Sequence, residues 1–206
     1  MAFNNAFERY KLGWKWSQDA YRELLKTTGG KERIAAYLAT LALGSAERRR
    51  LTELIPAIHA EKTKFYSAFV AGGAIPLRDG VLRLAEEALA AGGKLAIAST
   101  TTPANVDALL QSAFGARGLS MFSVIACGDQ VGRKKPAPDI YRLALASLRL
   151  APDACIAFED SVNGLRAAKA AGLATVITPS RWTAEEDFGG ADLVLPSLEG
   201  LELPQL

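Results

Sequence analysis

Two short segments of the sequence carry side chains that suit a phosphate group. The hydroxyl residues Ser99, Thr100 and Thr101 stand just before a proline that can open a helix. Hydroxyls and free backbone N–H groups at a helix N-terminus bind anions, although ordinary N-capping explains this run equally well when it is taken alone. Lys135 lies in the run KKPAPD, residues 134–139. A lysine can neutralise phosphate as a point charge, and the alternative is a solvated basic turn.

A third segment brings two carboxylates together. Glu159 and Asp160 are adjacent and follow the apolar run ACIAF, residues 154–158. A hard cation such as Mg²⁺ is held by one or two carboxylates, by waters and by substrate phosphate, so this pair fits a magnesium site. By itself, the pair is explained more simply as an acidic first turn that the helix dipole stabilises.

The elements that must position these segments alternate between strands and helices. Apolar runs of strand length alternate with amphipathic segments, and this pattern predicts an α/β fold with a doubly wound parallel sheet. In such a sheet, ligands bind beyond the carboxyl ends of the strands, where all three segments stand. The expected strands are 94–99, 123–127, 154–158, 174–178 and 192–195, and the expected helices are 103–114, 138–148 and 162–171.

The first third of the chain has a different character. Residues 1–72 contain only helical patterns, with one helix capped by Ser17 and another that starts at Ser45 and is kinked or split by Pro56. At Gly72-Gly73 the helical patterns give way to alternating strand and helix patterns. We therefore expect an α-helical cap domain over residues 1–72 and an α/β core over residues 73–206.

Composition narrows the functional class. The chain has 206 residues, a net charge of +2 and 50% hydrophobic residues, which predicts a packed globular protein that binds neither nucleic acid nor membrane. We read its two cysteines as reduced core residues, and we see no secretion signal. We expect a monomer in the cytoplasm, or in the plastid stroma if the source is a plant.

Taken together, the hydroxyl run, the lysine and the carboxylate pair follow the order of motifs in a known superfamily. The sequence resembles the haloacid dehalogenase-like (HAD) phosphohydrolases: IAST is similar to their second motif, KKPAPD to the third and FEDSVNGLRAAKAAGL to the fourth. The spacing of KPAPD and FEDS is typical of the branch that contains phosphoglycolate phosphatase and β-phosphoglucomutase. Within that branch, AFNNAF, TTGGKERI and HAEKTKFY look most like the CbbY subgroup.

The resemblance implies a fold and a set of residue roles. It implies a Rossmann-like core with a helical cap, and a Mg²⁺-dependent phosphatase for a phosphorylated sugar, notably xylulose 1,5-bisphosphate. It implies catalytic roles for Ser99 and Lys135, substrate contacts for Thr100 and Thr101, and Mg²⁺ ligation by Glu159 and Asp160. In the cap, the candidates for binding a second phosphate or sugar hydroxyls are Lys31, Arg33, His59 and Lys62. His59 and Lys62 fall on one helix face, although a lone histidine is more often a packing residue.

The family's first motif has no counterpart in the sequence. That motif is an Asp-x-Asp pair at the end of a strand ahead of the cap; its first aspartate attacks phosphorus and its second acts as general acid and base. No Asp-x-Asp occurs here, so the resemblance implies an inactive chain in which the edges at 95–98 and 155–158 face one another across a missing strand or pair directly. The missing motif is explained by a start-site error, by a truncation or by a real loss, and the sequence leaves all three open. Two alternative functions also remain open: a non-catalytic phosphosugar-binding module and a mutase.

Overall fold

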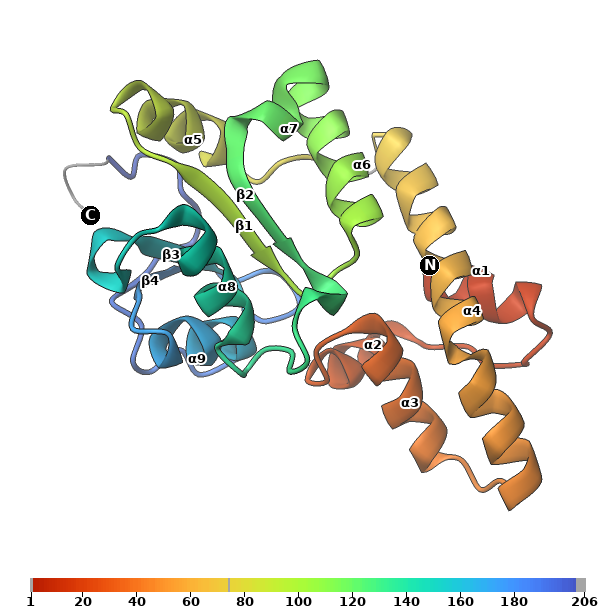
Figure 1. Cartoon of the computed structure of the whole chain (residues 1–206). Coiled ribbons are helices and arrows are strands. Elements are labelled where there is room, and N and C mark those ends of the chain that lie inside the picture. The colour runs from red at the N-terminus through yellow and green to blue at the C-terminus, as the bar shows by residue number, and fades with distance from the viewer. Residues whose placement is uncertain (1, 74, 203–206) are drawn as a thin grey trace.

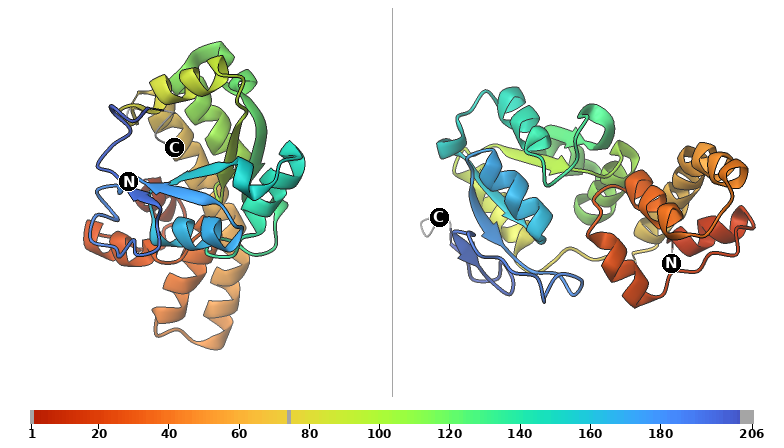
Figure 2. Two further views of the ribbon diagram at one scale, coloured as in Figure 1. Left: turned by 90° about the vertical axis from the view of Figure 1, so that its left-hand side faces the viewer. Right: turned by 90° about the horizontal axis from the view of Figure 1, so that it is seen from below.

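The protein consists of a helical part followed by an α/β part, as Figure 1 shows. The structure is a computed structural model, and it describes residues 2–73 and 75–202. The helical part contains α1 (Ala2–Arg9), α2 (Gln18–Leu25), α3 (Gly30–Thr40) and α4 (Ser45–Ala71). No strand occurs within residues 2–73. In the right-hand view of Figure 2, the helical part lies at one end of the molecule and the C-terminus lies at the other.

We call the helical part formed by α1–α4 the cap. An aromatic core holds its four helices together. Phe7, Ile34 and Ile58 are fully buried at its centre, and the Trp16 ring packs on Phe3 and Phe7, 4.8 Å from each between ring centroids. Asn4 also exchanges two 2.9 Å hydrogen bonds with the Trp16 backbone. Since α4 contacts both α1 and α3, this core fixes the surface that the cap turns toward the rest of the molecule.

Two expectations about α4 are corrected by the structure. The helix starts at Ser45 but its N-cap is Gly44, so Ser45 is not the cap. Pro56 does not split the helix, which runs for 27 residues through it. A proline removes one backbone hydrogen bond, but α4 is supported along its length by α1, α3 and α6, and this packing keeps the helix in one piece.

The second part alternates strands and helices as the sequence predicts. Every strand pair is parallel, which confirms the predicted fold class. Two helices, α5 and α7, were not expected from the sequence. The elements are α5 (Val81–Ala90), β1 (Leu95–Ser99), α6 (Pro103–Phe114), η1 (Gly115–Arg117), α7 (Gly118–Met121), β2 (Phe122–Cys127), η2 (Gly128–Gln130), α8 (Asp139–Leu148), η3 (Pro152–Ala154), β3 (Ile156–Glu159), α9 (Val162–Ala170), β4 (Ala174–Ile177) and β5 (Leu193–Val194).

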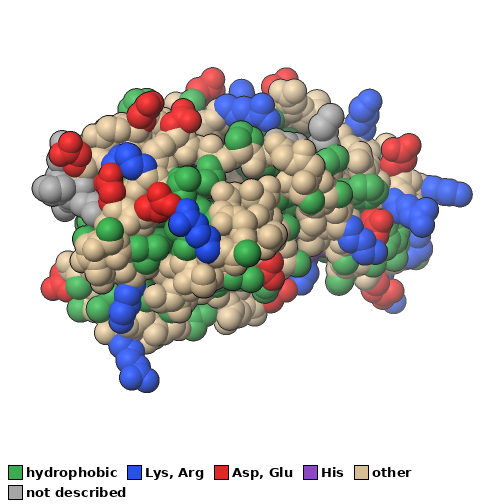
Figure 3. Space-filling view, turned by 90° about the horizontal axis from the view of Figure 1, so that it is seen from above, with side chains coloured by type: hydrophobic (Ala, Val, Ile, Leu, Met, Phe, Trp, Pro, Cys, Tyr) green, Lys and Arg blue, Asp and Glu red, His purple; other side chains and the backbone are tan. Residues whose placement is uncertain are grey.

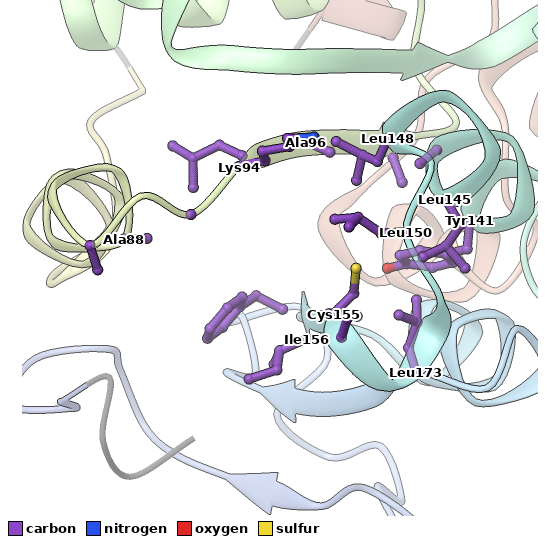
Figure 4. Close-up of a pocket in the computed structure, with 18 of the residues that line it drawn as sticks. Ala88, Lys94, Ala96, Tyr141, Leu145, Leu148, Leu150, Cys155, Ile156 and Leu173 are labelled. Atoms are coloured by element: carbon purple, nitrogen blue, oxygen red, sulfur yellow. The ribbon is translucent and has the colours of Figure 1, made fainter.

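The strands form two separate sheets. One has the order β1-β2 and the other β3-β4-β5, and no ladder joins β1 to β3 within the described residues. A cavity of about 630 Å³ lies between them, which we call the slot. Figure 4 shows Lys94 and Ala96 on one side of the slot, Cys155 and Ile156 across from them, and Tyr141 at its inner end. Of the two arrangements expected from the sequence, the structure adopts the open one.

Helix α8 is the element that spans the two half-sheets. It contacts β1 and β2 directly, and its Ile140, Ala144 and Leu145 share a buried cluster with Ala126 on β2 and Ala157 on β3. On the strand that borders the slot, by contrast, Ile156 and Phe158 remain 36% and 41% exposed. Side-chain packing therefore holds the halves together beneath the slot, while the backbone edges of β1 and β3 in the described residues are not paired with one another.

The surface is charged with both signs. On the face shown in Figure 3, acidic and basic side chains are interspersed, with hydrophobic side chains between them. Across the described part of the chain, no helix has the length and apolar character that a membrane crossing requires.

The slot generates a stability prediction. Joining an extended apolar segment ahead of residue 2, long enough to reach the slot, should raise the melting temperature by about 10 °C, because buried backbone groups without partners cost about 1–3 kcal/mol each and a chain of this size gains about 2–4 °C per kcal/mol. Calorimetry measures the change. A segment of equal length with proline at alternate positions is the control, since proline cannot donate to a ladder. An equal melting temperature for the two fusions would contradict the prediction.

Candidate active site

The carboxyl ends of β1 and β3 are joined by one lysine. Lys135 Nζ donates to the Ala98 carbonyl oxygen at 2.8 Å and forms a short ion pair with Glu159 Oε1. The side chains of Lys135 and Glu159 are only 11% and 8% exposed, so each charge is compensated mainly by the other. Lys135, Glu159 and the end of β1 therefore meet at one edge of the sheets, the place where ligands bind in parallel sheets.

Two further residues fix the position of Glu159. Tyr141, on α8, donates its hydroxyl hydrogen to Glu159 Oε1, and its ring lies 4.8 Å from Lys135 Nζ. Burial and the neighbouring carboxylate raise the pKa of Tyr141, so the hydroxyl stays protonated and acts as a donor. A Cβ on Gly164 would lie 1.9 Å from Glu159 Oε2, so a glycine there leaves the room that the carboxylate occupies.

Asp160 is placed differently from Glu159. Its side chain is exposed, and no described residue donates a hydrogen bond to its carboxylate, although its backbone carbonyl accepts one from Thr183. Desolvation by the surrounding protein, followed by repulsion from Glu159, raises the pKa of Asp160, while Arg78 and Lys135 act in the opposite direction. Asp160 is thus the carboxylate at this edge that is open to a cation.

The hydroxyl run lies at the end of β1. Ser99 pairs in register with Cys127 of β2, and its Oγ accepts a 3.3 Å hydrogen bond from the Thr101 N–H. Thr101 Oγ1 accepts from Asn105 Nδ2 at 2.7 Å. Thr102 is the N-cap of α6 but makes no side-chain cap hydrogen bond. Side-chain capping of α6 therefore does not account for this hydroxyl run. Thr100 lies in the same connection between β1 and α6.

Arg33 and Lys62 form a cationic cluster on the cap. Arg33 donates to the carbonyl oxygens of Leu24 and Thr27 at 3.0 and 3.2 Å. The centroid of the Phe3 ring is 5.9 Å from Arg33 Cζ and 5.4 Å from Lys62 Nζ. Desolvation and the charge of Arg33 lower the pKa of Lys62 to about 8. Carbonyl dipoles and aromatic faces therefore stabilise these cations, and an anion would be attracted to them.

His59 is a packed, neutral histidine. It is 8% exposed, and a Cβ on Gly30 would lie 2.3 Å from its Nε2, so the ring packs against the start of α3. Burial, together with the charges of Lys62 and Lys31, lowers its pKa to about 4. The packing alternative raised by the sequence describes the surroundings of this side chain.

Three contacts bring the α2–α3 turn of the cap onto the core. Lys31 Nζ donates to Asp129 Oδ2 at 2.7 Å. Asn163 Nδ2 donates to the Lys26 carbonyl and to Thr28 Oγ1, both at 3.0 Å. The rings of Tyr21 and Trp182 meet edge-on, 5.5 Å apart between centroids. The cap cations are thereby held near the strand ends that carry the core residues.

Sequence reasoning did not assign Tyr141, Asn163 or Asp129 to the site. Asp129 stands directly after a strand, a position where chemistry is expected, and Asn163 lies inside the run FEDSVNGL. Tyr141 gave no such signal, because a tyrosine on an amphipathic helix is indistinguishable from an ordinary core residue. As for metals, no group of three or more His, Cys, Asp or Glu side chains in the part of the chain that the structure describes is arranged to hold an ion.

Comparisons with known sequences find related proteins. A family profile for haloacid dehalogenase-like hydrolases matches residues 2–172. Protein CbbY from Rhodobacter capsulatus is 48% identical over 197 residues, which cover 96% of this chain and 85% of that protein. A CBBY-like protein from Arabidopsis thaliana is 39% identical over 200 residues, which cover 94% of this chain and 61% of that protein.

Solved structures show the same architecture. The crystal structure of CbbY from Rhodobacter sphaeroides in complex with phosphate superposes with a TM-score of 0.88 at 46% identity, covering 97% of this chain and 87% of that one. A mutant of the same protein, solved in complex with xylulose-(1,5)bisphosphate, matches equally well. A β-phosphoglucomutase from Clostridium difficile, 19% identical with a TM-score of 0.73, shares the fold.

The depressed pKa of His59 generates a prediction. Between pH 6.5, the ordinary pKa of an unfolded histidine, and pH 4, the unfolded chain binds a proton that the folded chain does not. The free energy of unfolding should therefore fall as the pH falls through this range, by up to about 3 kcal/mol from this group. His59→Gln should remove that part of the pH dependence.

Urea unfolding at pH 7 and pH 4.5 measures the effect in both proteins. Because His59 is the only histidine in the chain, its imidazole signals in a proton NMR titration also report its pKa directly. An NMR pKa near 6.5, or parallel pH profiles for the two proteins, would contradict the burial described here.

Proposed function

This chain belongs to the haloacid dehalogenase-like hydrolase family and is a hydrolase of the phosphatase type, and from that premise we propose that its substrate is a sugar bisphosphate, xylulose 1,5-bisphosphate in particular. The observation that carries the proposal is the pairing of two cationic sites. Lys135 lies at the strand ends of the core, and Lys31, Arg33 and Lys62 lie on the cap held over it. The relative solved with xylulose-(1,5)bisphosphate supports the same choice.

In this proposal the core binds the phosphate that is removed. The hydroxyls of Ser99, Thr100 and Thr101 and the N-terminus of α6 offer hydrogen-bond donors to phosphate oxygens. Lys135 supplies the neutralising charge, and its bond to Ala98 O fixes that charge beside Ser99. These groups position the phosphate and stabilise the charge on it, which is the main protein contribution in phosphoryl transfer.

Asp160 is the residue we propose as a Mg²⁺ ligand, with Glu159 behind it. Its exposed carboxylate, which accepts no hydrogen bond from the described residues, has the chemistry that Mg²⁺ prefers. Glu159, predicted as a second ligand, is instead bound to Lys135 and Tyr141 in this structure, so we propose that it acts mainly by orienting Lys135. When bound, Mg²⁺ would offset charge on the phosphate.

On the cap, Lys31, Arg33 and Lys62 are proposed to bind the second phosphate, and His59 to support Lys62 and the start of α3. Arg33 is already oriented by two carbonyl oxygens, so little conformational freedom is lost when it binds an anion. A phosphate at each end would give the site its preference for a bisphosphate.

Turnover also requires a carboxylate nucleophile, which the resemblance places in an Asp-x-Asp pair that this sequence does not contain. We predict that the 206-residue chain with Mg²⁺ releases phosphate from xylulose 1,5-bisphosphate or p-nitrophenyl phosphate no faster than a blank. A fusion that fills the slot with a segment ending in Asp-x-Asp should gain turnover, and the same fusion with Asn-x-Asp should not.

A phosphate-release assay checks this prediction. Mg²⁺-dependent turnover by the unfused chain, lost in Asp160→Ala and kept in the exposed control Asp153→Ala, would show that another carboxylate had taken the role. Binding without turnover in every fusion would favour a phosphosugar-binding module instead.

The second-phosphate site is tested through Lys62. Lys62→Met should raise the Kd for xylulose 1,5-bisphosphate about tenfold and leave the Kd for xylulose 5-phosphate within about twofold, because a desolvated charge–phosphate contact is worth more than about 1 kcal/mol. Titration calorimetry measures both constants. Lys64→Met is the matched control on the same helix, since Lys64 is exposed and pairs with Glu61. Equal losses for the two sugars would place Lys62 outside the second-phosphate site.

A further inference from the structure

One carboxylate in the structure lies between two lysines that come from different parts of the molecule. Asp129 Oδ2 accepts from Lys31 Nζ of the cap at 2.7 Å, and Asp129 Oδ1 is 3.1 Å from Lys134 Nζ of the core. Lys134 is only 12% exposed and also donates to the Gly128 carbonyl oxygen. A phosphate group would make the same kind of contact, with two of its oxygens bound to two ammonium groups.

Among the three candidate cations of the cap, only Lys31 has an acidic ion-pair partner in the described residues, and that partner is Asp129. Across residues 2–73 and 75–202, no other acidic side chain forms an ion pair with Lys31, Arg33 or Lys62. Desolvation lowers the pKa of Lys62 and of Arg33, so a nearby anion would stabilise the charged forms of both side chains. An anion that approaches Lys31 meets Asp129 as a negative group already in contact with that lysine.

Asp129 lies near the connection that follows β1. It stands two residues after Cys127, which pairs in register with Ser99, so Asp129 lies beside the connection that carries Thr100 and Thr101. Its side chain is 66% exposed, and that of Lys31 is 38% exposed. Both can therefore move without disturbing a packed core, and an exposed ion pair holds them together by less than about fivefold in equilibrium constant.

From these contacts we propose that Asp129 is an internal counter-ion, which holds Lys31 while the site is empty and gives it up to an anionic group of the ligand. The proposal rests on the proposed function, and it adds that the protein regulates its own anion affinity through a competing carboxylate. The cap stays in contact with the core during the exchange, because the Asn163 hydrogen bonds and the Tyr21–Trp182 ring contact involve no charge that the ligand displaces.

The competing explanation is that the Lys31–Asp129 pair serves only as a latch that holds the cap in its binding position. The two ideas predict opposite effects for Asp129→Asn. A counter-ion competes with the ligand, so its removal strengthens anion binding; a latch assists the ligand, so its removal weakens binding.

The experiment measures Kd by calorimetry at low ionic strength, for inorganic phosphate and for xylulose 1,5-bisphosphate, on the full chain. Asp129→Asn should lower both constants about two- to fivefold, and the gain should shrink as salt is added. Lys31→Met should raise the constants, and in a Lys31→Met background Asp129→Asn should have less than half of its effect. Asp153→Asn, an exposed aspartate of the same part of the molecule, is the control for lost negative charge and should change neither constant.

The outcomes separate this inference from the proposed function. If Asp129→Asn binds the anions more weakly or equally well, or if Asp153→Asn strengthens binding by the same factor, the counter-ion role of Asp129 is overturned. The proposed substrate is still supported in that case, provided that the unaltered chain binds the bisphosphate. A Lys31-dependent gain for inorganic phosphate without any binding of the bisphosphate supports the counter-ion and overturns the substrate. If neither anion binds any variant, both are overturned.

Discussion

The ion pair between Lys135 and Glu159 is the interaction on which the site depends. The two half-sheets share no backbone hydrogen bonds across the slot, and α8 packs beneath them through apolar side chains. At the carboxyl edge, Lys135 binds the end of β1 through Ala98 O and the end of β3 through Glu159. Removing one partner of a buried ion pair leaves an uncompensated charge, so the relative position of the two strand ends is coupled to the charges of the site.

The same ion pair gives the adjacent carboxylates Glu159 and Asp160 different surroundings. Glu159 is buried, and it is bound to Lys135 and to the Tyr141 hydroxyl, with Gly164 giving it room. Asp160, one residue further along, is exposed, and its carboxylate accepts no hydrogen bond from the described residues. Glu159 is the last residue of β3 and Asp160 follows it in the connection to α9, so the two neighbouring carboxylates lie in different surroundings.

The cap contributes charge rather than reactive groups. Its aromatic core supports Arg33 and Lys62 on carbonyl oxygens and ring faces instead of carboxylates, and this leaves their charge available to a ligand. Contacts through Lys31, Asn163 and Trp182 then bring that charge to the strand ends. Under the proposed function, recognition of a bisphosphate would require both parts, since each part would supply one cationic site.

The sequence by itself determined the fold class and the edge where the site lies. Apolar runs of strand length and helical periodicity depend on local residue order, so the parallel strands and most helices could be predicted, and the residues that follow β1 and β3 could be singled out from the rule for ligand sites in parallel sheets. The slot was also foreseeable as one of two arrangements, from the strand that the family resemblance leaves without a counterpart.

Only the tertiary structure decided which of these side chains bind one another. Asp129 and Lys31 are 98 residues apart in sequence, and Tyr141 meets Glu159 from a different element, so no local pattern records either contact. Likewise, Pro56 suggested a broken helix, yet packing on three sides carries α4 through it. The pairing of charges across a fold depends on distances in space, and sequence order fixes those distances only after the chain has packed.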